Sequence, residues 1–182
     1  MEYYILFQGS IEKETSLNLI NALLEADDYK EVDRIILLLS SIGGSIYYGF
    51  NIATVIKNLK KPIRIHATNE ISSIANINYL SAKERSAESY AKFFLHGASV
   101  GGNDINFNIE DLKEHTSSLR VQNERIAKFI FETTDMSLHD TKKLMRKRQS
   151  FSAEEAFNAK IVLEVKREQI PPGALRKNVI YV

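Results

Sequence analysis

Residues 34–45 read RIILLLSSIGGS, a continuous aliphatic run followed by two serines, an isoleucine, a pair of glycines and a third serine. An uninterrupted run such as Arg34 to Leu39 is typical of a parallel strand that is covered on both faces. Apolar residues at helical spacing follow the glycines, from Ile46 to Ile56. This stretch therefore predicts a buried strand, a tight glycine turn and a helix.

The same alternation of patterns extends in both directions from this stretch. Further strands are expected at 3–7, 63–67, 91–95 and 179–182, and further helices at about 15–26, 72–82 and 108–132 and after Ser137 and Ser152. The first helix should bury the face that carries Leu17, Ile20, Leu23 and Leu24. This order of elements predicts an α/β fold built from βαβ units with right-handed crossovers.

Length and composition narrow the classes of protein that remain. The 182 residues fit one domain, the formal net charge of +1 gives no basic field for nucleic acid, and there is no cysteine. The longest apolar run, Ile35 to Leu39, is too short to span a bilayer, and the N-terminus lacks the pattern of a signal peptide. We therefore expect a soluble cytoplasmic protein that binds neither nucleic acid nor a membrane.

The longest predicted helix follows a loop at 97–106 that contains Gly97, Gly101 and Gly102. Asn108 is a suitable N-cap, and the helix should run to about Glu132. Its apolar stripe consists of Ile109, Leu112, Leu119, Ile126 and Ile130, and is interrupted by Thr116 and Asn123. The polar interruptions predict that the stripe is not wholly buried.

Two junctions between a strand and a helix carry residues suited to chemistry. Glycines such as Gly43 and Gly44 let backbone N–H groups approach a ligand, although a plain turn uses the same residues. The second junction, at 69–75, contains Ser72 and Ser73, and a serine here can cap the helix or present its hydroxyl as a nucleophile. The glycines lack the spacing of a dinucleotide site and no Walker lysine follows them, so no nucleotide cofactor is expected.

His96 is the histidine best placed for catalysis, because it ends a predicted strand where sites of α/β sheets gather. A histidine bonded for purely structural reasons would explain the same pattern. His66 is a weaker candidate within a strand, and His115 and His139 lie on helices among charged residues. No pair of histidines has the spacing of metal ligands, so we expect no metal and no cofactor.

Taken in order, these segments resemble the proteolytic subunit of Clp protease. The family pattern is Ser-Pro-Gly-Gly-Ser, then Ala-Ala-Ser-Met-Gly-Ala, then a strand that ends in His; here the matching segments are Ser41 to Ser45, Ile71 to Asn76 and Phe94 to His96. Residues 151–156, FSAEEA, resemble the family's Phe-Met-Ser-Ala-Glu-Glu-Ala. The likeness extends from about residue 4 to 165.

The resemblance implies a ClpP/crotonase-like fold of repeated ββα units with a protruding handle helix. It implies one domain over 1–182, with a head at about 1–96 and 136–165, a handle at about 97–135 and a tail at 166–182. It further implies a serine endopeptidase with Ser73 as nucleophile, His96 as general base, and the N–H groups of Gly43 and Ile74 as the oxyanion hole. The implied assembly is a homo-oligomeric ring, two of which stack through the long helix.

The chain departs from the family pattern at positions that matter for catalysis. The family's triad aspartate falls on Leu144, which cannot orient an imidazole. Asp140 lies one turn earlier and is a candidate, although Ser137-x-x-Asp140 also has the pattern of a helix start; a backbone carbonyl or an acid from another subunit is a further alternative. Ile42 replaces the proline before the glycine pair, and Ala75 replaces the glycine after the nucleophile.

These departures leave rival functions open. Leu144 favours a degenerate subunit that serves structure or assembly, whereas Ser73 with His96 argues against the acyl-CoA chemistry of crotonases, which use no such pair. The first strand begins at about Tyr3 and leaves nothing for the family's axial loops, which argues against a Clp-type ATPase partner. The leading expectation is a serine-type peptidase, a hydrolase that acts on peptides or unfolded protein.

Overall fold

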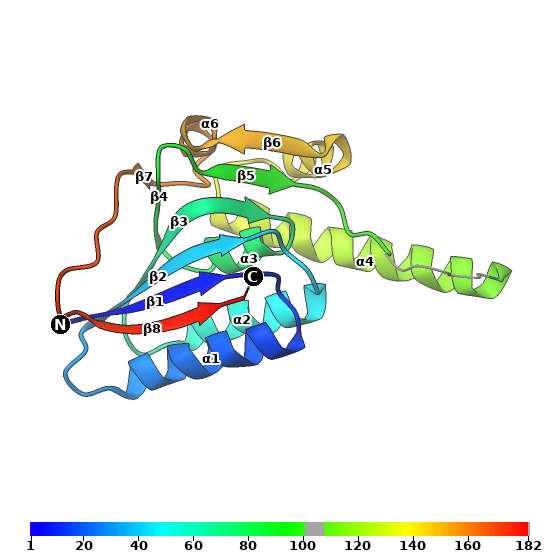
Figure 1. Cartoon of the computed structure of the whole chain (residues 1–182). Coiled ribbons are helices and arrows are strands. Elements are labelled where there is room, and N and C mark those ends of the chain that lie inside the picture. Colours follow the sequence, from blue (N-terminus) through cyan, green and yellow to red (C-terminus); the bar gives the residue numbers. More distant parts are fainter. Residues whose placement is uncertain (101–107, 182) are drawn as a thin grey trace.

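The computed structural model describes residues 1–100 and 108–181, which form one eight-stranded sheet with helices packed on it (Figure 1). The strands are β1 Glu2–Gln8, β2 Arg34–Ser41, β3 Ile63–Ser72, β4 Glu84–Ala87, β5 Lys92–Leu95, β6 Gln149–Ser152, β7 Glu164–Val165 and β8 Leu175–Ile180. Their order is β6-β5-β3-β2-β1-β8, with β4 beside β3 and β7 beside β4. The pairs are parallel apart from β5 with β6, which confirms the α/β fold.

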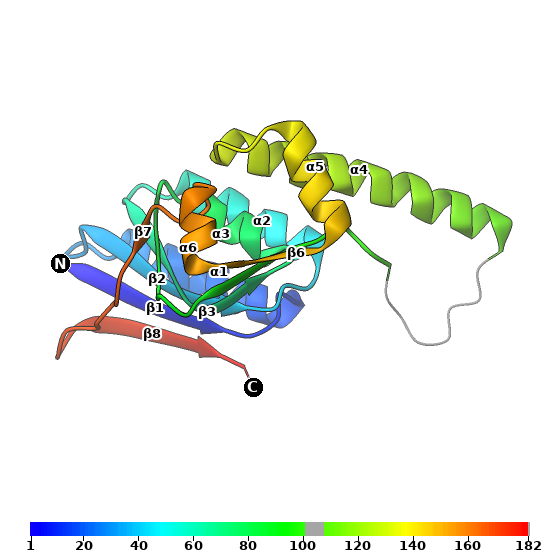
Figure 2. The same cartoon turned by 90° about the horizontal axis from the view of Figure 1, so that it is seen from above.

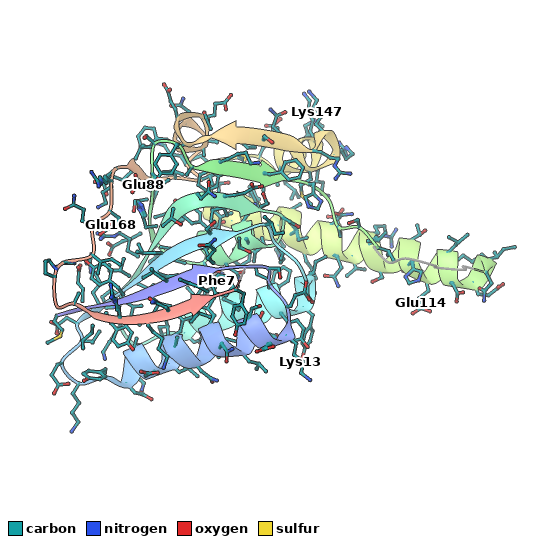
Figure 3. The ribbon with its side chains drawn as sticks, in the orientation of Figure 1. Phe7, Lys13, Glu88, Glu114, Lys147 and Glu168 are labelled. Carbon is teal, nitrogen blue, oxygen red and sulfur yellow. The ribbon has the colours of Figure 1, made fainter. Side chains whose placement is uncertain are left out.

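Helices cover one face of this sheet (Figure 2). Their bounds are α1 Lys13–Asp28, α2 Ile46–Asn58, α3 Ala75–Leu80, α4 Ile109–Thr133, α5 Leu138–Lys147 and α6 Ala153–Asn158. The main core contains Tyr3, Ile5 and Phe7, alternate residues of β1, together with buried residues of α1, α2 and α3. Phe7 is labelled in Figure 3. The two-residue period of a strand therefore selects which side chains meet the helices.

The buried face of α1 differs from the prediction. Leu17 and Leu24 are 48% and 46% exposed, whereas Leu19 and Leu23 are fully buried. The contact face of the helix also contains the buried alanines 22 and 26, which let α1 approach the sheet closely. A count of large apolar residues overlooks such alanines, and for this reason the prediction that Leu17 and Leu24 are buried is wrong.

β2 is covered on both faces, as its aliphatic run predicts. Ile35, Leu37 and Leu39 belong to the main core, and Ile36 and Leu38 face the other way. On that second face they pack with Tyr4 and are covered by residues of the C-terminal segment, Ile170 and Ala174. The segment ends in β8, which pairs with β1 and starts earlier than the predicted strand at 179–182.

β3 is longer than predicted and changes neighbour along its length. Residues 64–67 pair with β4, and residues 70–72 pair with β5. The polar stretch at 68–70 does not read as a strand, but pairing with β5 keeps it extended. The consequence is that the end of β3, just before Ser73, lies beside the end of β5, just before His96.

α4 extends well beyond the sheet (Figures 1 and 2). Of its apolar stripe only Ile126 and Ile130 are buried, and Ile109 and Leu112 are 66% and 50% exposed.

The helix caps agree with the sequence. Asn108 is the N-cap of α4, as predicted, and Ser137 and Ser152 cap α5 and α6. The glycines at 101 and 102 of the predicted loop lie outside the described residues. No helix in the described ranges combines the length and apolarity needed to cross a bilayer.

Candidate active site

The glycine turn after β2 lies directly against the serine that follows β3. Gly43 has a φ of 93°, and a Cβ at this position would lie 2.6 Å from Ser73 Cβ and 2.8 Å from the carbonyl oxygen of Ser72. Any larger residue is therefore excluded at Gly43 by its backbone conformation and by the lack of space. The turn is a tight contact between two motifs and does more than connect a strand to a helix.

Ser73 occupies a left-handed conformation, with a φ of 58°, between β3 and α3. Its N–H donates to the carbonyl of Phe94 at 2.9 Å, and its side chain is half-buried. Such a backbone is costly for a residue with a side chain and is found mostly where neighbouring structure enforces it, often at functional sites. The N-cap of α3 is Ile74, so neither serine caps this helix.

Ser72 has a different environment. It is buried, and its hydroxyl donates to a carboxylate oxygen of Glu70 at 2.5 Å. Glu70 also forms an ion pair with Lys92, and the hydrogen bond from Ser72 lowers the pKa of the Glu70 carboxyl group. The Ser72 hydroxyl is therefore engaged in a structural contact, while Ser73 lines a cavity.

The buried Asn76 holds the turn around Ser73 in place. Its side-chain NH₂ group donates to the carbonyls of Ser73 and Phe94, at 3.1 and 2.9 Å, and more weakly to that of Ile71 at 3.3 Å. These bonds connect β3, the turn and β5. Sequence reasoning missed this role, although an asparagine among apolar residues is a signal that a buried polar contact is present.

His96 follows β5 and is half-buried. Its Nδ1 lies 2.6 Å from the carbonyl oxygen of Gly97. Because a carbonyl can only accept a hydrogen bond, this contact requires a proton on Nδ1. In the neutral imidazole Nε2 is then free of its proton and is the basic atom.

Ser73 and His96 line the same cavity, which has a volume of about 210 Å³. Its other walls are Gly44, Ser45, Ile46, Ile74, Leu95, Gly97, Ala98, Ser99 and Ile126. The residues come from the glycine turn, the start of α3, the end of β5 and α4. The fold thus brings together side chains from three separate motifs of the sequence around one small space.

The two backbone N–H groups expected to form the oxyanion hole, those of Gly43 and Ile74, differ in their hydrogen bonding. The N–H of Gly43 donates to Ser41 Oγ at 3.1 Å, so it already has a partner within its own turn. Ile74 directly precedes α3, where the first N–H groups have no partner inside the helix. A bound carbonyl oxygen would have to replace Ser41 Oγ at Gly43. Ser41 was noted only as the first residue of the glycine motif, and nothing in the pattern marks its contact with the Gly43 N–H.

Neither of the two side-chain positions considered for the third triad member, Asp140 and Leu144, is hydrogen-bonded to His96. Asp140 is exposed in the first turn of α5, where its carboxylate accepts a hydrogen bond from Ser137 Oγ, the N-cap residue, at 2.6 Å. Leu144 is half-buried and has no polar atoms. Among the residues that the structure describes, no carboxylate is hydrogen-bonded to His96; its partner is the Gly97 carbonyl.

The other histidines lie elsewhere. His66 is fully buried in β3, with Nδ1 2.9 Å from Ser86 Oγ and Nε2 3.4 Å from Glu88. Burial lowers the pKa of His66 despite the opposing influence of nearby acids, so it is a neutral core residue. His115 lies in α4 and His139 in α5. Within the described ranges, no three His, Asp or Glu side chains are grouped as metal ligands.

Comparison with known proteins gives a consistent result. Residues 1–169 match the sequence profile of the Clp protease family. The chain is 25% identical over 155 residues to "ATP-dependent Clp protease proteolytic subunit 1" of Chlamydia muridarum, across 84% of this chain and 80% of that protein. A ClpP1 mutant from Listeria monocytogenes has a similar fold, with a TM-score of 0.82 at 22% identity, over 91% of this chain and 92% of that one. Because the family profile covers nearly the whole chain, this protein belongs to the Clp protease family.

Proposed function

We propose that this chain is a peptidase subunit that cleaves peptides or unfolded protein by a Ser73 and His96 mechanism. Ser73 Oγ adds to the carbonyl carbon of the scissile bond while His96 Nε2 takes its proton. His96 then gives that proton to the departing amine, and water releases the acyl group from Ser73. The observation that carries this proposal is that Ser73 and His96 line one cavity of about 210 Å³.

The Gly97 carbonyl takes over one of the two tasks of a triad aspartate. By accepting a hydrogen bond from Nδ1–H it holds the tautomer in which Nε2 is the base. It has no full negative charge, however, and stabilises the imidazolium less than a carboxylate does. Replacing the carboxylate of a serine protease by an amide costs about 10⁴ in turnover through the wrong tautomer; here the tautomer is held and only the charge is missing, so the loss should be smaller. We therefore expect a slow peptidase.

Stabilisation of the tetrahedral oxyanion is assigned to the N–H groups of Gly43 and Ile74. The bond of Gly43 to Ser41 Oγ is 3.1 Å long, and the developing oxyanion is a stronger acceptor than a hydroxyl. If the Gly43 N–H exchanges Ser41 Oγ for the oxyanion in the transition state, it stabilises the charged intermediate more than the bound substrate. Such a difference in binding lowers the barrier of the reaction.

The proposed assembly is a homo-oligomeric ring that encloses the active sites. Support comes from the family and from α4, whose outer half projects from the sheet with Ile109 and Leu112 exposed. These residues, with Thr116, line a shallow groove on the helix. Burial of such a face against another copy of the chain would remove its apolar surface from water.

A fluorophosphonate probe, which reacts with activated serines, tests the nucleophile. We expect slow labelling of the wild-type protein and none in Ser73→Ala, with peptidase activity lost in parallel. Ser72→Ala is the matched control, because it removes a hydroxyl one residue away, and it should still be labelled. Labelling that survives in Ser73→Ala but is lost in Ser72→Ala would contradict the assignment.

A second candidate function is a non-catalytic subunit that serves assembly. Two observations favour it, namely Leu144 at the triad position and the engagement of the Gly43 N–H by Ser41. An oligomer that is folded but shows neither labelling nor hydrolysis, even at high protein concentration, would support this second function over the first.

A further inference from the structure

The two residues after His96 are held by both of the helices that pack beside the site. The N–H of Gly97 donates to the carbonyl of Met145, in α5, at 3.2 Å. The N–H of Ala98 donates to Asn123 Oδ1, in α4, at 2.7 Å. The carbonyl between these two N–H groups, that of Gly97, is the one that accepts from His96 Nδ1 at 2.6 Å.

The Gly97 carbonyl and the Ala98 N–H belong to one peptide unit, which is planar and rigid. Asn123 and His96 therefore bind opposite edges of the same peptide unit. A bond that fixes the N–H also fixes the direction of the carbonyl, and it polarises the carbonyl into a better acceptor. The bond from Gly97 N–H to Met145 anchors the preceding peptide unit and leaves this plane unconstrained.

The lack of a side chain at Gly97 lets Asn123 reach this peptide unit and leaves the peptide unit free to rotate. A Cβ on Gly97 would lie 2.9 Å from Asn123 Oδ1, closer than such atoms approach one another, so a side chain here would push Asn123 away. Glycine also permits many orientations of the peptide that follows it. Without an external anchor, the carbonyl would spend part of its time turned away from His96.

We infer that Asn123 is a positioning residue for catalysis, which fixes the His96 tautomer through the peptide unit between Gly97 and Ala98. This inference rests on the proposed function of His96 as the general base. Asn123 and that peptide unit together perform the orienting task of a triad carboxylate, which is to hold the proton of His96 on Nδ1. The side chain of Asn123 is neutral and does not titrate, so the arrangement orients the imidazole without adding charge to the site.

The His96 tautomer can be measured without any catalysis. In the full-length protein labelled with ¹⁵N-histidine, long-range ¹H–¹⁵N spectra distinguish a protonated Nδ1 from a bare one. We expect neutral His96 to carry its proton on Nδ1 in the wild type and to become a mixture of tautomers in Asn123→Ala. Asn123→Asp keeps an acceptor for the Ala98 N–H and should restore the wild-type tautomer.

Kinetic measurements provide the second readout. With a fluorogenic peptide, Asn123→Ala should lower kcat by roughly 10- to 100-fold, the range that small misplacements of catalytic groups cost, with little change in KM. Asn123→Asp should recover most of the loss. The matched control is Gln122→Ala, which removes a neighbouring amide of the same helix that contacts Arg125. It should behave as the wild type, and thermal unfolding should show that all variants fold.

The outcomes separate this inference from the proposed function. If hydrolysis depends on Ser73 but Asn123→Ala keeps both kcat and the Nδ1-protonated tautomer, the role of Asn123 is wrong and the peptidase mechanism stands. If the wild type shows no hydrolysis that depends on Ser73, the proposed function fails. The tautomer measurement still decides whether Asn123 positions His96, and an unchanged tautomer in Asn123→Ala would overturn that role.

Discussion

At Gly43 the absence of a side chain serves two purposes. It permits a φ of 93°, and it leaves room for Ser73, whose Cβ would otherwise lie 2.6 Å from a Cβ of residue 43. Ser73 in turn has a left-handed backbone that most side chains avoid. The strained backbone of Ser73 and the absence of a side chain at Gly43 belong to the same contact. The residue type at each position therefore restricts the residue types that fit at the other.

We predict that Gly43→Ala abolishes labelling by a fluorophosphonate probe and destabilises the fold. The methyl group would collide with Ser73 and with the Ser72 carbonyl, and the nucleophile would have to move. Gly173→Ala is the matched control, because Gly173 also has a positive φ, of 77°, but an added methyl group there would meet no atom within 4 Å. It should cost only about 1 kcal/mol from backbone strain, measured by chemical denaturation, and retain labelling. Equal behaviour of the two variants would contradict this account.

Position 144 offers a direct test of the missing acid. We predict that Leu144→Asp raises the rate of peptide hydrolysis, because a carboxylate near Nδ1 would stabilise the imidazolium in the transition state. The gain should vanish when Ser73→Ala is added. His139→Asp adds an acid at an exposed position of the same helix and should leave the rate unchanged. A rate unaffected by Leu144→Asp would show that α5 does not bring residue 144 to His96.

At the scale of elements, one buried arginine joins segments that are distant in the chain. The guanidinium of Arg85, in β4, donates to the carbonyls of Ala82, Thr133, Lys160 and Ile161 at 2.7 to 3.2 Å. These carbonyls lie before β4, at the end of α4 and after α6. Burial lowers the pKa of Arg85, but an arginine retains its charge in proteins. Four hydrogen bonds thus compensate for the removal of that charge from water.

We predict that Arg85→Met lowers the free energy of unfolding by about 3 kcal/mol or more, because several buried carbonyls lose their donor at once. Arg167→Met, at a residue outside this network, should change it by less than about 0.5 kcal/mol. Urea denaturation of both variants measures the difference. A small loss for Arg85→Met would mean that water replaces the guanidinium at these carbonyls.

At the scale of the molecule, the chain divides into a sheet with its helices and a projecting part of α4 (Figure 2). The buried residues of α4 are near its C-terminal end, at 126, 127 and 130. Its first half exposes apolar side chains, which natural proteins seldom leave facing water in contiguous groups. The face that the proposed assembly would bury therefore belongs to the same helix as Asn123, which binds the Ala98 N–H.

We predict a ring oligomer, measured by light scattering at micromolar concentration and moderate salt. Leu112→Glu should shift the population toward smaller species, because it places a charge on the exposed apolar face of α4. Val121→Glu is the control, at a residue that is equally exposed but lies about half a turn around the helix. A wild-type monomer under these conditions would contradict the proposed assembly.

The helices and five of the eight strands could be read from local patterns, whereas β4, β6 and β7 were not expected. The aliphatic run of β2, the serine N-caps of α5 and α6 and the asparagine N-cap of α4 each depend on residues a few positions apart, and these predictions are confirmed. The strand that ends just before His96 followed from the same patterns, whereas the strand before Ser73 was expected to end at residue 67 and runs to Ser72. Their roles as nucleophile and base came from resemblance and stay predictions.

Tertiary contacts decided what local patterns could not. The buried face of α1 depended on how closely two alanines approach the sheet, and the full length of β3 depended on pairing with β5. The hydrogen bond of Asn123 to the Ala98 N–H depended on how α4 packs beside the end of β5, since the position of Asn123 in the helix suggested only a polar interruption. Hydrogen bonds between residues far apart in the chain leave no periodic trace in a sequence, because one side chain at one position is sufficient to make them.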